Sequence, residues 1–434
     1  MKSIWTNTVT PPNFPALTQN IKADVLIIGG GMAGILCAYF LKLSGVDYVL
    51  VEANRIGTGI TKNTTAKITS QHGLIYDKLL KNAGIEKARM YLQANQNAVA
   101  QFKKLSVQFP CSLEEKDAFV FSASSTGDSY AIEREVTAVN RLGFNAQFVK
   151  ESPLPFKISG AVKFENQAQF NPLQFLYEIA NGLNIYENTI VREMANHIAI
   201  ANNVKIKAKK IIVATHFPML NKHGSYFLKM YQCRSYVIAL ENAANVDGMF
   251  IRGVEDGLSF RNAGNLLLIG GGGHRTGEIG GNWQVLREFA KKAYPNAVEK
   301  YAWATQDCMT LDGVPYIGRY SGSANDLYVS TGFNKWGMTG SMVSAMILTD
   351  MMLGRKNPYA EVFSPQRSIL KPQLAINGMK AIGNLLTPLT PRCPHMGCAL
   401  KWNRAERSWD CPCHGSRFEK NGKIIDNPAT GGLK

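Results

Sequence analysis

The sequence predicts an α/β fold: a parallel sheet flanked by helices, an inserted antiparallel part and a small C-terminal module. In the body of the chain, short apolar runs of strand length alternate with apolar helical stretches, which is typical of a parallel sheet. Two further apolar runs have no helix beside them, which favours antiparallel pairing. A segment with three prolines and little periodicity, residues 354–372, then separates the body from the C-terminal end.

Each expected element has its own local reason. The strands are β-branched and end at glycine or at a polar residue, and the helices lack internal proline. The helix at 171–180 opens on Asn-Pro, which is a helix-start signal. The expected parallel strands are residues 22–28, 46–51, 208–214 and 327–330, the helices are 32–43, 171–180 and 341–353, and the unpartnered runs are 118–122 and 235–240.

Charge is concentrated at the C-terminal end of the chain. The formal net charge is +16, and residues 366–434 hold eleven Lys or Arg against four Asp or Glu, a net +7. A basic surface attracts an acidic protein or a nucleic acid, although solubility alone explains it equally well. We expect an acidic protein partner and no nucleic acid, because the motifs below point to redox chemistry.

No segment is expected to span a membrane. The apolar runs at 25–41 and 337–353 are interrupted by glycines and are shorter than the roughly 20 residues that a spanning helix needs. The first twenty residues lack the apolar core of a signal peptide. We therefore expect a cytoplasmic protein, in which clustered cysteines are more often cofactor ligands than a disulfide framework.

A glycine-rich turn predicts a dinucleotide site. Gly29-x-Gly31-x-x-Gly34 follows an expected strand and opens an expected helix, and Glu52 ends the next strand. Glycine permits the tight turn, the approach of a pyrophosphate and close packing of helix on strand, while an acidic residue accepts hydrogen bonds from a ribose. The candidate binding residues are Gly29, Gly30, Gly31, Met32, Ala33, Gly34 and Glu52.

The identity of the dinucleotide is not decided by this geometry alone, since FAD and NAD bind to the same turn. A second glycine cluster, residues 270–273, is followed by the polar stretch HRTGEIGG and not by an apolar helix. It is not a second fingerprint, so we expect no separate nicotinamide domain.

Three stretches resemble the D-amino-acid oxidase/glycine oxidase family of FAD enzymes. They are NRIGTGITKNTTAKITSQHG after Glu52, IIVATHFP at 211–218, and DGVPYIGRY with LYVSTGFNKWGMTGS between 312 and 341. The resemblance implies FAD and a body of residues 1–365. Within that body it implies a discontinuous FAD domain (about 20–90, 160–216 and 305–365) and an inserted substrate domain (about 91–159 and 217–304).

The same resemblance implies further flavin-binding residues. One group would approach the flavin and its phosphates, Thr215 would close a strand near the adenosine, and a last group would lead into a helix whose N-terminus faces the flavin pyrimidine edge. The residues are Thr58, Thr61, Thr65 and Ala66, then Thr215, and then Gly332, Lys335, Gly337 and Met338.

One departure from the family concerns the substrate. Amino-acid oxidases of this group often carry an arginine shortly before the Thr-x-Asp segment, and that position is Asp307 here. A carboxylate does not bind a substrate carboxylate, which favours a cationic amine over an amino acid, unless Asp307 is structural. The catalytic residues are unknown: Lys67, His72, His216 and His274 lie near the expected flavin loops, but none stands out as a base.

The C-terminal stretch CPHMGCALKWNRAERSWDCPCHGS holds four cysteines and two histidines. By spacing, Cys393-x-His395 and Cys411-x-x-His414 suit either tetrahedral zinc or a Rieske [2Fe-2S] cluster. The zinc alternative leaves Cys398 and Cys413 without an obvious task.

CPHMGC and CPCHGS resemble the two cluster loops of Rieske proteins. The resemblance implies that Cys393 and Cys411 bind one iron, that His395 and His414 bind the other, and that Cys398 and Cys413 form a disulfide joining the loops. The module, 393–434, would be β-rich but abbreviated, because the preceding linker, 366–392, reads mostly as a helix. Such a small module is expected to pack on the body or across a homodimer.

The expected function is that of a flavin–iron–sulfur oxidoreductase. A small organic substrate, with an amine as one candidate, would exchange two electrons at FAD, and the cluster would exchange single electrons with an acidic ferredoxin or flavodoxin. The alternative is an FAD amine or amino-acid oxidase that uses oxygen and in which the module is only structural. A nucleic-acid binder with a zinc knuckle would leave the dinucleotide unit unexplained.

Overall fold

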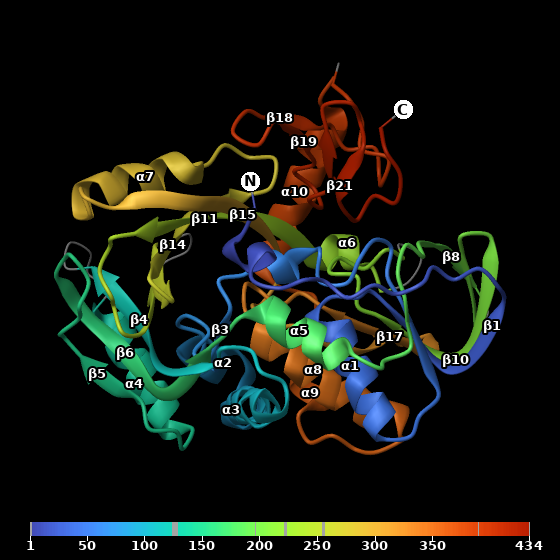
Figure 1. Ribbon diagram of the computed structural model, residues 1–434, viewed down its shortest axis with the longest axis horizontal. Helices are drawn as coiled ribbons and strands as arrows, with labels where there is room; N and C mark the ends of the chain where they lie inside the picture. Colours follow the sequence, from blue (N-terminus) through green and yellow to red (C-terminus); the bar gives the residue numbers. More distant parts are fainter. Residues whose placement is uncertain are drawn as a thin grey trace.

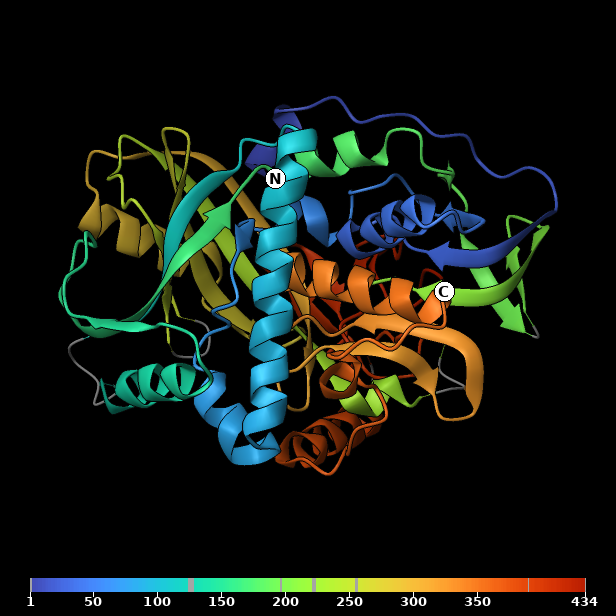
Figure 2. The same cartoon turned by 90° about the horizontal axis from the view of Figure 1, so that it is seen from below.

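The computed structural model describes residues 2–123, 129–195, 197–220, 224–253, 257–388 and 390–433. Two large sheets form the body. The module lies on top of it, beside α7 (Asn282–Ala293) and the ends of β11 (Met230–Glu241) and β15 (Val298–Thr310) (Figure 1). The long helix α3 (Ile85–Gln108) runs between the two halves of the body (Figure 2). The mixed α/β fold class is confirmed.

An eight-stranded sheet contains the predicted parallel strands. β1 pairs in parallel with β10 on one side and β2 on the other, and β10 pairs in parallel with β17. Helices α1 (Met32–Leu43) and α8 (Gly337–Met352) pack against each other beside it. The strand order is β16 (Tyr316–Ser321), β17 (Ala324–Thr331), β10 (Val204–Val213), β1 (Ile21–Ile28), β2 (Tyr48–Val51) and β7 (Ile185–Tyr186), with β8 (Val191–Ala195) and β9 (Ile198–Ala201) on a branch.

A nine-stranded sheet, mostly antiparallel, forms the other half of the body. The two runs without helical partners are β4 and β11 of this sheet, and the second glycine cluster lies inside β14 and not in a helix-opening turn. The order is β15 (Val298–Thr310), β11 (Met230–Glu241), β14 (Leu266–Arg275), β13 (Ser259–Ala263), β12 (Met249–Arg252), β4 (Glu114–Ala123), β6 (Ile158–Gln169) and β3 (Lys67–Ile68), with β5 (Gln147–Val149) beside β6. β6 and β15 run across the expected domain boundaries at 160 and 305.

Further helices surround the two sheets. α5 starts as its sequence predicts, because the Asn171 side chain accepts a hydrogen bond from the Gln174 backbone N–H at 3.1 Å and Pro172 occupies the first turn. The other elements are the 3₁₀ helices η1 (Ile4–Asn7) and η2 (Ile60–Asn63) and the helices α2 (Tyr76–Ala83), α4 (Ser129–Arg141), α5 (Pro172–Ala180), α6 (Tyr226–Lys229) and α7 (Asn282–Ala293). In the described part of the chain, no helix is both long and apolar enough to cross a membrane.

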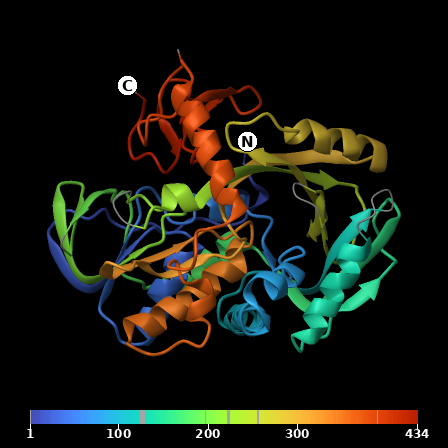
Figure 3. The ribbon, with the colours of Figure 1, turned by 180° about the vertical axis from the view of Figure 1, so that it is seen from behind.

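The expected linker is packed against the body for much of its length. It contains α9 (Ala360–Phe363), whose Val362 and Phe363 are buried, and the Arg367 guanidinium binds the Asp312 carboxylate with an Nε–Oδ2 distance of 2.7 Å. Helix α10 (Pro372–Leu386) then rises from the body to the module (Figure 3).

The module itself is small and β-rich. Its antiparallel sheet consists of β18 (Lys401–Asn403), β19 (Ser408–Asp410), β20 (Arg417–Glu419) and β21 (Ile424–Asp426). Among its described residues, the buried apolar cluster consists of four cysteines with Leu400, Phe418 and Ala429. A core of this size contributes little stability by itself, so contacts with the body matter.

Candidate functional site

The glycine turn between β1 and α1 has no room for side chains. A Cβ on Gly29 would lie 2.5 Å from the Ala214 carbonyl oxygen, and one on Gly34 would lie 1.9 Å from the Gly29 carbonyl oxygen. Gly29 also has a φ of 114°, which L-residues with side chains rarely adopt. β1, α1 and β10 therefore approach each other closely at the point where a pyrophosphate would lie.

The start of α1 directs backbone N–H groups toward side-chain oxygens. Gly30 N donates to Glu52 Oε2 at 2.7 Å, and Met32 N donates to Thr61 Oγ1 at 3.1 Å. Burial raises the pKa of Glu52 above its ordinary value. Helix α1 begins at this turn, and a helix N-terminus attracts phosphate, so the arrangement fits a dinucleotide.

A cavity of about 1530 Å³ opens between the two sheets and the module. This volume exceeds the roughly 300–1,000 Å³ of ordinary small-molecule sites, so a dinucleotide and a small substrate fit together. Gly34, Ala66 and Gly332 are not among its lining residues and pack behind it. The candidate residues that line it are Gly29, Gly30, Gly31, Met32, Ala33, Glu52, Thr58, Thr61, Thr65, Thr215, Lys335, Gly337 and Met338.

Three ionisable side chains singled out by the sequence line the same cavity. Burial lowers the pKa of His72 to about 3, that of His216 to about 4 and that of Lys67 to about 7. His72 is fixed by hydrogen bonds to Tyr91 Oη at 2.6 Å and to the Thr69 carbonyl oxygen at 2.8 Å. His72 is thus a neutral, structural residue.

His274 has a different environment. It is not among the residues that line the cavity, and its Nε2 lies 3.0 Å from Tyr236 Oη. It therefore belongs to the polar contacts of the nine-stranded sheet rather than to the flavin site.

Asp307 also lines the cavity. It lies on β15 opposite Cys233 of β11. Burial raises its pKa to about 6, against the opposing effect of Lys335 and Arg234. Its carboxylate is therefore a negative group held at the wall of the cavity, where an ammonium group would be attracted to it.

The two cysteine–histidine loops fold alike. In each loop the first cysteine N–H donates to the carbonyl oxygen five residues on, Cys398 at 2.9 Å and Ser416 at 2.8 Å. The glycine N–H donates back to that first cysteine carbonyl, from Gly397 at 2.8 Å and from Gly415 at 2.9 Å. Both glycines have positive φ, 76° and 86°, which explains why glycine stands at this place in both loops.

The loops bring all six candidate side chains together. Cys398 and Cys413 form a disulfide with their Cα atoms 6.7 Å apart, and Cys393 and Cys411 are buried as thiols. The hydrogen bond from Cys411 lowers the pKa of Cys393 to about 7. The ring centroids of His395 and His414 are 5.0 Å apart, so two thiols and two imidazoles converge on one place.

His414 has the hydrogen bonding of a metal-binding imidazole. Its Nε2 lies 3.0 Å from the Phe227 carbonyl oxygen, and its buried Nδ1 has no hydrogen-bond partner among the described residues. Burial lowers its pKa to about 3, so the ring is neutral. Since the carbonyl can only accept, the proton lies on Nε2, which leaves the Nδ1 lone pair to bind iron or zinc.

Side chains of the body bind the second loop through its backbone. Gln232 Nε2 donates to the His414 carbonyl oxygen at 2.7 Å, and Gln306 Nε2 donates to the Gly415 carbonyl oxygen at 2.8 Å. The Arg275 Nε donates to the Pro412 carbonyl oxygen at 3.1 Å. Sequence reasoning missed these three residues, because hydrogen bonds to backbone carbonyls leave no motif in the strands that supply them.

One short segment links the cavity to the histidines. Thr215 and His216 line the cavity, while the Phe217 ring centroid lies 6.3 Å from that of His395 and 6.2 Å from that of His414. Asn427 of the module donates to the Thr215 carbonyl oxygen at 2.6 Å and to that of Phe217 at 3.0 Å. The histidine side of the module therefore faces the body.

Buried ions join the module to β11. Arg234 pairs with Glu406, whose carboxylate also accepts from Tyr236 Oη at 3.0 Å and from Arg417 Nη2 at 2.8 Å. Arg417 in turn binds Asp410 at 3.0 Å. The side chains of Arg234, Glu406 and Arg417 are only 4%, 9% and 6% exposed, so this network is shielded from solvent.

These two sites define the class of the protein. The FAD dependent oxidoreductase (DAO) family model matches residues 24–351, and the Rieske [2Fe-2S] domain model matches residues 370–434. The chain belongs to the DAO family of FAD-dependent oxidoreductases and carries a C-terminal Rieske domain. The predicted enzyme class and the predicted cofactors, FAD and a [2Fe-2S] cluster, are confirmed, and iron–sulfur is the correct alternative to zinc.

Some relatives match the whole chain, and others match the FAD-dependent body alone. The putative Rieske 2Fe-2S iron-sulfur protein YhfW of Bacillus subtilis is 33% identical over all of this chain and 97% of its own length. Gamma-glutamylputrescine oxidoreductase of Escherichia coli is 22% identical over 79% of this chain and 86% of its own. Glycine oxidase from Geobacillus kaustophilus has a TM-score of 0.68 at 19% identity, covering 80% of this chain and 99% of that one, and thus shares the fold of the body.

Proposed function

We propose that this protein oxidises a small cationic amine at FAD and passes the electrons singly through the Rieske centre to an acidic carrier protein. When bound, FAD accepts a hydride from a carbon next to nitrogen, and the cluster carries one electron at a time. An amine that loses a hydride and a proton becomes an imine, and the two electrons leave in two single steps. A small-molecule substrate is what the oxidoreductase family implies; the amine, the carrier, a homodimer and a cytoplasmic location remain predictions.

The contact between segment 215–217 and the module supports this proposal most strongly. The segment lines the flavin cavity at Thr215 and packs on both candidate histidines at Phe217. A module with only a structural role would not need its histidine side buried against the wall of the cavity. Electron exchange within one chain does need it.

Each group of residues would have a separate task. The turn at Gly29–Gly31 and the start of α1 would bind the pyrophosphate, and Glu52 would bind the ribose. Cys393 and Cys411 would bind one iron and His395 and His414 the other. The disulfide between the two remaining cysteines would hold the loops in register.

The amine substrate is inferred from Asp307. Its carboxylate lies at the cavity wall, where it would pair with an ammonium group and repel a substrate carboxylate. The Escherichia coli relative, gamma-glutamylputrescine oxidoreductase, is also named for an amine-derived compound.

Anaerobic reduction of the holoprotein tests the coupling. Amines and amino acids are added in turn, and flavin bleaching is followed together with the EPR signal of the reduced cluster. We expect an amine to bleach the flavin and the cluster signal to appear with it. Peroxide formation in air with a cluster that is never reduced would contradict the coupling and favour the oxygen-using oxidase.

Replacing Asp307 with Asn should raise the KM for amines about 100-fold, because it removes the charge opposite the ammonium group. Since burial raises the Asp307 pKa to about 6, wild-type kcat/KM for amines should fall as the pH drops below 6 and the carboxylate is protonated. The variant should lack that fall. Steady-state kinetics across pH measure both effects.

The matched control is Asp326→Asn, because Asp326 is a partly exposed aspartate on β17 that forms an ion pair with His197 at 3.9 Å. It should behave as wild type, and both variants should keep their FAD and their reduction by dithionite. An unchanged KM in Asp307→Asn would show that Asp307 is structural.

A further inference from the structure

Helix α10 turns a polar face toward the body and an apolar face toward solvent, which is the reverse of an ordinary surface helix. Asn377, its one fully buried residue, turns toward the body and accepts from Arg275 Nη1 at 2.8 Å and from Gln373 Nε2 at 3.1 Å. The opposite side is apolar and exposed: Met379 is 66%, Ile382 60% and Leu386 77% accessible. A helix that served only to pack the module would turn its apolar side inward.

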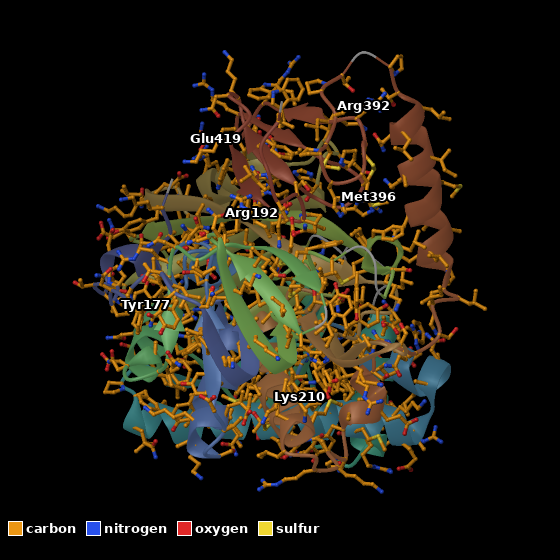
Figure 4. All side chains as sticks on the ribbon, turned by 90° about the vertical axis from the view of Figure 1, so that its right-hand side faces the viewer. Tyr177, Arg192, Lys210, Arg392, Met396 and Glu419 are labelled. Atoms are coloured by element: carbon orange, nitrogen blue, oxygen red, sulfur yellow. A yellow bond between two sulfur atoms is a disulfide. The ribbon has the colours of Figure 1, made fainter. Side chains whose placement is uncertain are left out.

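The exposed side continues onto the first cluster loop. Arg392 donates to the carbonyl oxygens of Leu385 at 3.1 Å and Gly397 at 3.2 Å, and so fixes the end of α10 to the loop that carries Cys393 and His395. Met396 of this loop is 40% exposed and lies beside the helix (Figure 4). We call Ile376, Met379, Ile382, Leu385, Leu386 and Met396 the α10 patch.

The surroundings of the α10 patch are positive. Residues 366–405 contain no Asp or Glu and six Lys or Arg. Of these six, Arg367 pairs with Asp312 and Lys380 with Glu278 of the body, so the net positive charge near the patch comes from Lys371, Arg392, Lys401 and Arg404. An apolar centre with a charged rim is the usual composition of a protein docking site, and the sign of this rim fits an acidic partner.

We propose that the α10 patch docks an acidic one-electron carrier protein. The inference rests on the proposed function, since it names the place where that function would deliver its electrons. The histidine side of the module faces the body, whereas the loop at Met396 and the end of α10 are open to a partner. Each amine oxidised releases two electrons, so two oxidised carrier molecules dock in succession and each leaves reduced by one electron.

A carrier protein fits these observations better than a lipid surface or a second copy of the chain. The apolar residues are continuous with a candidate cluster loop, where a redox partner must come close, and a lipid bilayer has no such requirement. A second copy would bring a patch of the same positive sign against this one, and like charges repel.

The experiment compares full-length holoprotein with the variants Met379→Glu/Ile382→Glu and Val107→Glu. All three substituted residues are exposed, and Val107 belongs to α3, a helix on the opposite side of the body from the module (Figure 1). The probe is an acidic plant-type [2Fe-2S] ferredoxin, and its Kd is measured by calorimetry at low and high salt. We expect the double variant to bind about tenfold more weakly or worse, Val107→Glu to bind as wild type, and added salt to weaken wild-type binding.

Equal binding by all three proteins would overturn the proposal. Wild-type binding to anionic phospholipid vesicles that the double variant loses, or a wild-type dimer in light scattering that the double variant breaks, would assign the patch to a membrane or to a second copy. The proposed function fails separately: if amine never reduces the cluster while the variants still differ in ferredoxin affinity, the docking surface stands without it.

Discussion

Replacing Arg234 with Met should lower the stability of the module on the body by about 3 kcal/mol, because it leaves Glu406 buried with fewer charges opposite it. Arg234 comes from β11 of the body and Glu406 from the module, and both are nearly inaccessible. Urea unfolding followed by the visible absorbance of the cluster measures this, since loss of the module's contacts releases the iron before the body unfolds.

A double-mutant cycle distinguishes the ion pair from mere packing. Glu406→Gln should also destabilise the module, because it leaves Arg234 buried without its carboxylate partner, while Arg417 keeps Asp410 at 3.0 Å and Asp426 at 3.0 Å. The combination of the two substitutions should be less harmful than the sum of the single effects. Strictly additive effects would show that Arg234 and Glu406 are not coupled.

The same network predicts an acid limit. Burial raises the pKa of Glu406, but Arg234 and Arg417 outweigh this effect and hold the pKa below its ordinary value of 4.5. A lowered carboxylate pKa contributes stability that is present above the unfolded-state pKa and is lost as the pH falls through the folded-state pKa. The contribution of Glu406 to the stability of the module should therefore be lost only as the pH falls below 4.5, and Arg234→Met, which removes one cause of the lowered pKa, should lose it at higher pH.

The sequence predicted the parts of both sites that depend on local geometry. The glycine turn needs residues without side chains at fixed spacing, and Gly29 and Gly34 are so close to neighbouring carbonyl oxygens that no other residue fits. The cluster loops likewise need a glycine with positive φ four residues after the first cysteine, at Gly397 and Gly415. Such constraints are visible in a single chain because every participant lies within a few residues.

The contacts between body and module could not be predicted in the same way. Gln232, Gln306 and Arg275 come from three strands and bind backbone carbonyls of loops more than a hundred residues away. Any loop sequence presents such carbonyls, so neither partner carries a signal. The helix at α10 was predicted from its composition, but the direction of its apolar side was not, because that direction depends on the pairing of Asn377 with Arg275.

A fragment of residues 366–434 should fail to fold when produced alone. It keeps α10, both loops and the four strands, yet it loses the partners of its buried polar groups. Glu406 would lose Arg234, the His414 Nε2–H would lose the Phe227 carbonyl, and Asn377 would lose Arg275. The expected result is narrow amide proton dispersion by NMR and no retention of iron after reconstitution.

The fragment keeps the disulfide and the cluster ligands, which are the features that usually stabilise a small domain. A failure to fold would therefore be due to the missing body. A disulfide contributes about 2–4 kcal/mol, and a bound cluster would add more. Two features lower the stability of the fragment: its apolar core consists of a few residues, and the apolar side of its helix faces solvent. The full-length holoprotein is the control, and a fragment that folds and holds iron would show that the body does not support the module. In that case stability would not explain why the histidine side of the module is buried against segment 215–217. Electron exchange with the flavin would then be the remaining explanation for this contact.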